Sequence, residues 1–170
     1  MLIDNVTTKV IDILEDKIEK GDEISILTGL FSIYAYNHLK ESLCEIELAR
    51  ILFSQAKGLD AFDSESPFGA LNGTSAENKY RNKLTQKAVA QGFADWIERK
   101  TSIKLVKQPG AVHQHIINIK NPTSSSIAIN GAQFTGQGLG LTQSSGFDMI
   151  SLISSNQADE QLSFFNRVWG

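Results

Sequence analysis

Two of the three histidines of this 170-residue chain lie two positions apart, in the run Val112-His113-Gln114-His115-Ile116. The run is typical of a strand, and side chains two apart on a strand project from the same face. Neighbouring imidazoles could hold a metal, or act as nucleophile and acid–base pair on a phosphate. A metal would need a third ligand, for which Asp148 is the nearby acid downstream. The spacing alone leaves three interpretations open: a metal site, a phosphoryl-transfer site and an ordinary strand face.

Further short motifs lie before and after the histidine pair. They are Thr28-Gly29-Leu30-Phe31-Ser32, Tyr80-Arg81, Gln86-Lys87-Ala88, Asp95-Trp96-Ile97, the glycine-rich run 130–141 and the closing Phe164-Phe165-Asn166-Arg167-Val168-Trp169. In their order and spacing they resemble the phospholipase D superfamily. The resemblance is closest to the phospholipase D-like domain at the N-terminus of Swi/Snf-type and other superfamily-two bacterial helicases, and in related restriction nucleases. It covers nearly all of the chain.

The family's half-site motif reads His-x-Lys, then an Asp, then Gly-Ser-x-Asn. His113 stands at the position of the nucleophilic histidine, but His115 replaces the motif lysine, and Lys120 falls at the motif aspartate. Asp148 resembles the acidic residue on the strand after the glycine-rich loop.

The motif asparagine can be placed in two ways. An alignment anchored on Phe134-Thr135 puts Gln133 at that asparagine and Gly131 at the motif serine. Strict counting from His113 instead puts Asn130 there. Both amides therefore stay candidates.

The resemblance implies metal-free phosphodiester chemistry with no cofactor. His113 would attack phosphorus and form a phosphohistidine, and a second histidine from a paired half-site would protonate the leaving oxygen. Lysine and asparagine would neutralise charge on the phosphoryl oxygens. His115 is positively charged only when it is protonated, which requires a pH near or below its ordinary pKa of about 6.5. Losing the permanent charge of the motif lysine at this position would cost roughly 2–4 kcal/mol of transition-state stabilisation.

Three functional interpretations follow. One is a degenerate phospholipase D-like domain that serves in DNA binding or assembly, and the second is an active phosphodiesterase or nuclease that uses His113. The third is an unrelated mixed-sheet domain. Because the chain holds one half-site, the first two predict a homodimer that brings His113 to His113, or a domain that belongs to a longer helicase.

The charge distribution supports a phosphate partner. The net charge is −3, but residues 79–107 hold 8 basic and 2 acidic side chains, a balance of +6. A local basic surface can bind phosphates inside an acidic protein. We take Arg81, Lys83 and Lys87 as the candidate nucleic-acid contacts, beside the alternative of a solvated helix face.

Hydrophobic periodicity predicts the elements that position these residues. Helices are expected over 5–20, 34–43, 77–100 and 159–169, and strands over 23–30, 45–53, 103–106, 112–119, 126–129 and 149–153. This order predicts an α/β fold, or a mixed α+β one, with one mixed sheet covered by helices on both faces. We find no repeat or linker, so residues 1–170 are expected to form one domain.

Composition narrows the protein class. Hydrophobic residues make up 41% and charged residues 21%, as in globular proteins. No apolar run approaches the roughly 18 residues that span a bilayer, and the acidic N-terminus does not resemble a signal peptide. Cys44, the one cysteine, is expected to be a small buried apolar side chain in a reducing cytoplasm. We therefore expect a cytoplasmic protein without a membrane partner.

Overall fold

A computed structural model describes residues 1–54, 83–107, 114–123, 125–142 and 149–170, and the side chains of all these residues except 83–86. The strands are β1 (Leu2–Ile3), β2 (Glu23–Thr28), β3 (Leu48–Phe53), β4 (Thr101–Leu105), β5 (Ile116–Lys120), β6 (Ser126–Asn130) and β7 (Ile150–Ser154). The helices are α1 (Val10–Lys17), α2 (Ile33–Leu43), α5 (Lys83–Lys100) and α6 (Ser155–Trp169). Within this described part, no helix is long and apolar enough to cross a bilayer.

The seven strands form one open sheet in the order β1-β7-β6-β5-β2-β3-β4. β2, β3 and β4 run parallel to one another, while β5, β6, β7 and β1 pair antiparallel. The central strand β2 is buried from Ile24 to Thr28, as its nearly continuous apolar run predicts for a strand covered on both faces. The predicted mixed sheet is therefore confirmed.

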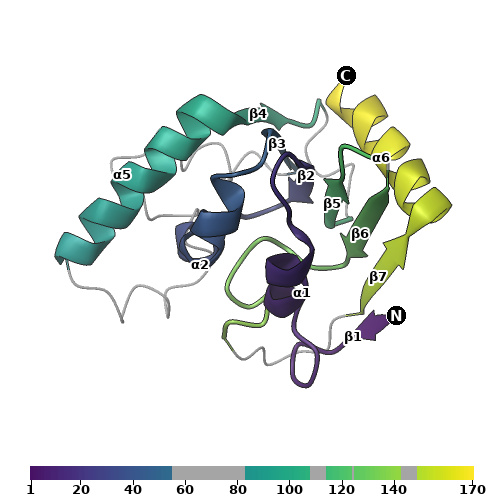
Figure 1. Cartoon of the computed structure of the whole chain (residues 1–170), viewed down its shortest axis with the longest axis horizontal. Coiled ribbons are helices and arrows are strands. Elements are labelled where there is room, and N and C mark those ends of the chain that lie inside the picture. The colour runs from purple at the N-terminus through teal and green to yellow at the C-terminus, as the bar shows by residue number, and fades with distance from the viewer. Residues whose placement is uncertain (55–82, 108–113, 124, 143–148) are drawn as a thin grey trace.

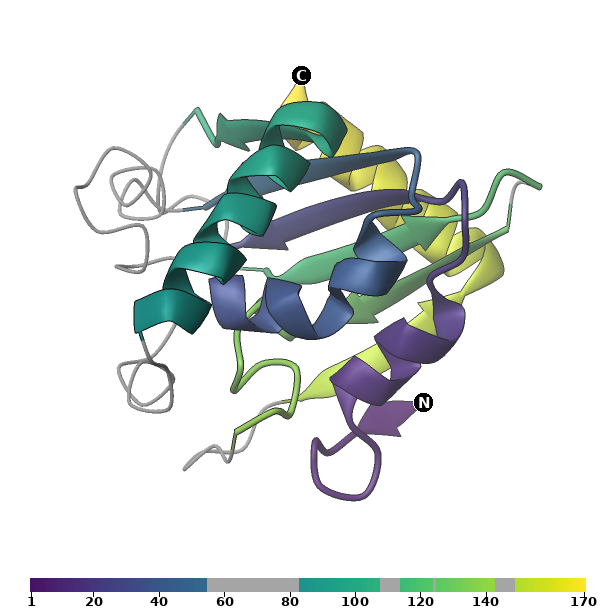
Figure 2. The same ribbon diagram turned by 60° about the vertical axis from the view of Figure 1, so that its left-hand side comes forward.

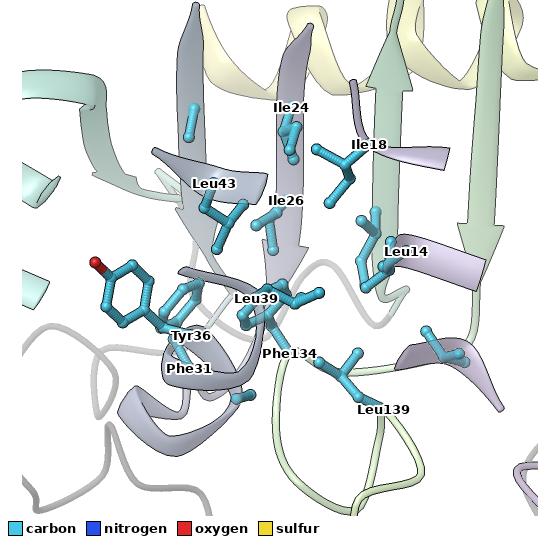
Figure 3. Packing of buried hydrophobic residues seen from close by; sticks show 14 of the residues in the cluster. Leu14, Ile18, Ile24, Ile26, Phe31, Tyr36, Leu39, Leu43, Phe134 and Leu139 are labelled. Atoms are coloured by element: carbon cyan, nitrogen blue, oxygen red, sulfur yellow. The ribbon is translucent and has the colours of Figure 1, made fainter. Parts of the chain in front are cut away.

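Helices cover both faces of this sheet, as expected from the sequence. α1, α2 and α5 lie on one face and α6 lies on the other (Figure 1; Figure 2 shows α6 behind the strands). The larger core lies under α1, α2 and α5, and Figure 3 shows part of it around Ile26, Leu39 and Phe134. The smaller core, under α6, consists of Leu27, Leu52, Val106, Ile116 and Phe165.

The first helix is shorter than predicted, because two side chains hold the preceding residues in a loop. Asp4 Oδ1 accepts hydrogen bonds from the backbone N–H groups of Val6, Thr7 and Thr8 at 2.9–3.0 Å. Asn5 has a φ of +58° and accepts from Val10 N at 2.9 Å through Oδ1. These bonds offer the backbone an alternative to the helix, so the helix begins at Val10.

The cysteine prediction was wrong. Cys44 is exposed and caps α2, because the chain turns there toward β3. Trp96 is fully buried and donates from Nε1 to Leu43 O at 2.9 Å. Trp169 is only half-buried, with the Arg50 guanidinium and the Lys104 ammonium over its ring.

Candidate functional site

One edge of the sheet gathers the segments that carry the candidate residues. Leu27, near the end of β2, pairs with Ile116 at the start of β5. Ile116 also pairs with Asn130 at the end of β6, and Asn130 pairs with Ser151 at the start of β7. We call this the site edge. In sheets of this kind, ligands bind outside the carboxyl ends of parallel strands, and β2, β3 and β4 end here.

His115 lies at the site edge but not within a strand, which corrects the prediction of a strand over 112–119. β5 begins one residue later, at Ile116. The His115 carbonyl still accepts a hydrogen bond from Gly131 N at 2.9 Å. Regular pairing stops there because Gly131, with a φ of +92°, turns the chain out of β6.

The His115 imidazole is half-buried, and its Nδ1 atom is buried. In the register set by the Gly131–His115 hydrogen bond, His115 falls on the same face of the sheet as Ile117 and Ile119. Those two residues belong to the core under α1 and α2. The side chain therefore lies on that face, at its rim.

The turn after β2 is bonded directly to the glycine-rich loop. Leu30 N donates to Gln133 Oε1 at 2.9 Å, and Ser32 N donates to Phe134 O at 2.8 Å. The buried Thr28 hydroxyl donates to Leu30 O at 2.6 Å and accepts from Phe134 N at 3.3 Å.

The phenyl rings of this turn and this loop also stack. The centroids of Phe31 and Phe134 lie 4.4 Å apart at an interplanar angle of 9°, and Figure 3 shows them at the ends of the strands. The turn, the loop and the start of β5 thus form one packed unit.

The glycine-rich loop uses most of its own N–H groups. Leu141 N and Thr142 N both donate to Gly136 O, and Gly138 N donates to Thr135 Oγ1. Asn5 Nδ2 donates to Gly138 O at 2.9 Å, which ties the loop to the chain before α1. The loop is therefore a folded support for the edge, and few of its amides remain for an anion.

The two candidates for the motif amide lie apart. Asn130 alternates along β6 with Ile129, which packs in the core under α1 and α2, so its side chain falls on the face under α6. Gln133 contacts the turn after β2, on the side where Phe134 packs. The structure thus brings Gln133, and not Asn130, to the face on which His115 lies.

The other predicted residues are described only in part. His113, Asp148 and Arg81 lie outside the described residues, as does the predicted helix start at 77. Gln114 follows His113 in the sequence and Met149 follows Asp148, and both are exposed at the site edge. Lys83 begins α5, and the Lys87 side chain on that helix is exposed. Among the described residues, no three His, Cys, Asp or Glu side chains are placed to hold a metal.

Sequence reasoning missed the structural role of Asn5, which connects α1 to the glycine-rich loop. Its only signal was an asparagine beside an aspartate before an apolar helical pattern, which is common at helix starts. Comparison with known proteins adds no assignment: no protein-family model matches the chain, and neither does any curated protein.

Proposed function

We propose that this chain is a phospholipase D-like, nuclease-related domain that binds or processes DNA in the cytoplasm. One observation supports this most. The turn Thr28–Ser32 and the glycine-rich loop, which the resemblance places around the histidine motif, are hydrogen-bonded to each other beside the start of β5. That arrangement would hold a histidine motif against a phosphodiester.

The same geometry favours a degenerate site whose main activity is binding. The motif lysine is absent, and a half-buried imidazole replaces it at His115. The Gln133 amide oxygen is bonded to Leu30 N, so this side chain already has a structural task. The alternative is an active, metal-independent phosphodiesterase that uses His113 as its nucleophile.

The proposed assembly is a homodimer, because one half-site supplies one nucleophilic histidine. A helicase domain or subunit is the second proposed partner, in keeping with the same resemblance. Sedimentation velocity measured on the full chain separates a monomer from a dimer.

DNA binding is tested by reversing charge on α5. Lys83→Glu/Lys87→Glu should weaken duplex binding about equally for all sequences, because phosphate contacts do not read bases. The control is a single charge reversal outside α5, Lys20→Glu, to be compared with Lys87→Glu alone; Lys20 is exposed beside the start of β2, at the opposite edge. Wild-type affinity should fall linearly with the logarithm of salt concentration. Binding that is absent at low salt, or indifferent to salt, would exclude a nucleic-acid role.

Catalysis is tested separately, with a bis-aryl phosphodiester and single-stranded DNA in EDTA from pH 5 to 8. If His115 acts as imidazolium, cleavage should increase toward pH 5, and His115→Lys should flatten that dependence. His113→Ala must abolish cleavage. If the wild type and His115→Lys are both silent while folded, the active alternative fails and the binding interpretation stands.

A further inference from the structure

Two cations of the sheet lie against the aromatic rings at the C-terminal end of α6, which ends beside β4 (Figures 1 and 2). Cζ of Arg50, on β3, lies 4.9 Å from the centroid of the Phe165 ring and 5.5 Å from that of the Trp169 ring. Nζ of Lys104, on β4, lies 4.7 Å from the Trp169 centroid. We call Arg50, Lys104 and Trp169 the α6 cluster.

The strand register places both cations on the face of the sheet that α6 covers. Lys104 pairs with Leu52, which belongs to the smaller core under α6. Arg50 lies two positions before Leu52 on the same strand, so it falls on the same face. Arg50 pairs with Ser25 on β2 and with Ser102 on β4. Because Ser102 and Lys104 are exposed, the cluster is accessible from the side of β4, the last strand of the sheet.

Arg50 is a half-buried cation without a carboxylate partner. Its Nη2 donates to Ser25 Oγ at 2.9 Å, but neither Arg50 nor Lys104 forms an ion pair within the described part of the chain. Burial lowers the pKa of Arg50, and the exposed Glu23 on β2 opposes this from beyond ion-pair distance. Charges that lose water are usually paired, and a guanidinium has five N–H donors, so Arg50 can still bind an anion.

A phosphate that carries a flat base matches the chemistry of the cluster. Guanidinium groups bind phosphate through pairs of N–H groups, and a neighbouring ammonium adds a second positive charge. Lys104 Nζ donates to Trp169 O at 3.3 Å, which leaves two of its three N–H groups for an anion. The Trp169 ring is only half-buried. Proteins that hold single-stranded nucleic acids combine cations for the backbone with aromatic rings on which bases stack.

We propose that the α6 cluster binds single-stranded nucleic acid, with a backbone phosphate held by Arg50 and Lys104 and a base against Trp169. This site is distinct from the candidate contacts on α5, which lies on the other face of the sheet. The proposal rests on the proposed nucleic-acid function for the source of the phosphate, in a strand, and not for the charge of the cluster.

Three probes distinguish the sources of phosphate: a labelled twenty-nucleotide oligothymidylate, its duplex with oligoadenylate, and thymidine monophosphate. Binding of the first two is measured by fluorescence anisotropy and of the third by calorimetry. Each phosphate contact adds about 0.7 to the salt slope of single-strand binding, or about fivefold in affinity between 1 M and 0.1 M salt. Lys104→Glu should lose at least this much for oligothymidylate.

The matched control is Lys40→Glu, which should keep the wild-type slope. Lys40 is exposed and, like Lys104, lies at the C-terminal end of a helix, but on the other face of the sheet. Arg50→Gln is the second variant, because it removes the charge and keeps an amide that can reach Ser25 Oγ. We expect it to weaken oligothymidylate binding in the same way. Circular dichroism confirms that the variants fold.

Tryptophan fluorescence gives a local readout. Trp96 is fully buried, so a base that stacks on the cluster should quench the emission of Trp169. Trp169→Phe should remove this quenching while it keeps a ring beside both cations. Quenching that persists in Trp169→Phe would exclude a base at this position.

The outcomes separate this site from the proposed function. If Lys104→Glu and Arg50→Gln leave oligothymidylate binding unchanged, the cluster is overturned and the proposed function stands on α5. An equal loss for the duplex overturns the assignment to single strands. If no oligonucleotide binds but thymidine monophosphate binds in a Lys104-dependent way, the phosphate site holds and the nucleic-acid function fails. If no probe binds, both proposals fail.

Discussion

Replacing Gln133 with asparagine tests whether the amide at the motif position has a structural task. Gln133 Oε1 accepts from Leu30 N at 2.9 Å, across 103 positions of sequence, and both residues are half-buried. Asparagine keeps the amide but withdraws it by one methylene, so this bond should break. Leaving a partly buried N–H unpaired costs about 1–3 kcal/mol. For a domain of this size, that corresponds to a fall in Tm of roughly 2–12 °C.

The measurement is thermal and urea unfolding of Gln133→Asn beside Gln137→Asn. Gln137 is exposed in the same loop, so its variant should stay within about 0.5 kcal/mol of the wild type. The urea m-value should not change, because the unfolded chain exposes the same surface. If Gln133→Asn unfolds like the wild type, the bond between loop and turn does not stabilise the protein, and the packed unit at the site edge loses its main polar link.

Gly131→Ala should cost more than about 2 kcal/mol in urea unfolding, since its φ is +92° and a Cβ would lie 2.2 Å from Met149 O. Gly92→Ala is its control, because nothing lies within 4 Å of a Cβ added at Gly92 on α5. We expect this variant to gain about 0.5–1 kcal/mol in its free energy of unfolding. Equal effects at the two sites would refute this interpretation of Gly131. Burial raises the pKa of Asp22, although its carboxylate accepts a hydrogen bond from Glu19 N. The folded state therefore favours the protonated carboxyl. This stabilisation is full below the ordinary pKa of 3.8 and is lost as pH rises through the folded-state pKa. Asp22→Asn should therefore gain Tm relative to the wild type as pH rises from 3.5 to 7, and a pH-independent difference would contradict it.

The strands and helices with strong local patterns were predictable from the sequence. The apolar run of β2 can be buried only between two layers, and the helical periodicity of α2 matches its one buried face. β1 carried no comparable signal, because two residues are too few to show a pattern; the strand is held by pairing with β7 and by burial of Ile3 in the core. α6 begins four residues before the predicted start at 159, in Ser155, whose φ of +57° no hydrophobic pattern could indicate.

The residue types of the candidate site could be predicted from the sequence, but their arrangement in space could not. Sequence spacing brought His115 and the two amides into one region, and the structure places all three near the site edge. Which face each side chain occupies depends on where pairing stops. That point is decided by the conformation of Gly131 and by its contact with the backbone of Met149, which lies 18 positions along the chain.

The contact between Gly131 and Met149 limits how the motif serine and asparagine could be restored. In the alignment anchored on Phe134-Thr135, Gly131 stands at the motif serine, yet the Met149 carbonyl already occupies the space that a serine Cβ would need. A serine could enter only if the segment leading into β7 moved away, and that strand pairs with β6 through Asn130. Gln133, for its part, cannot become asparagine without releasing Leu30 N. Restoring the motif one residue at a time should therefore destabilise the edge before it improves a phosphate site. Any return of catalysis would need coordinated changes in the loop, the turn and β7.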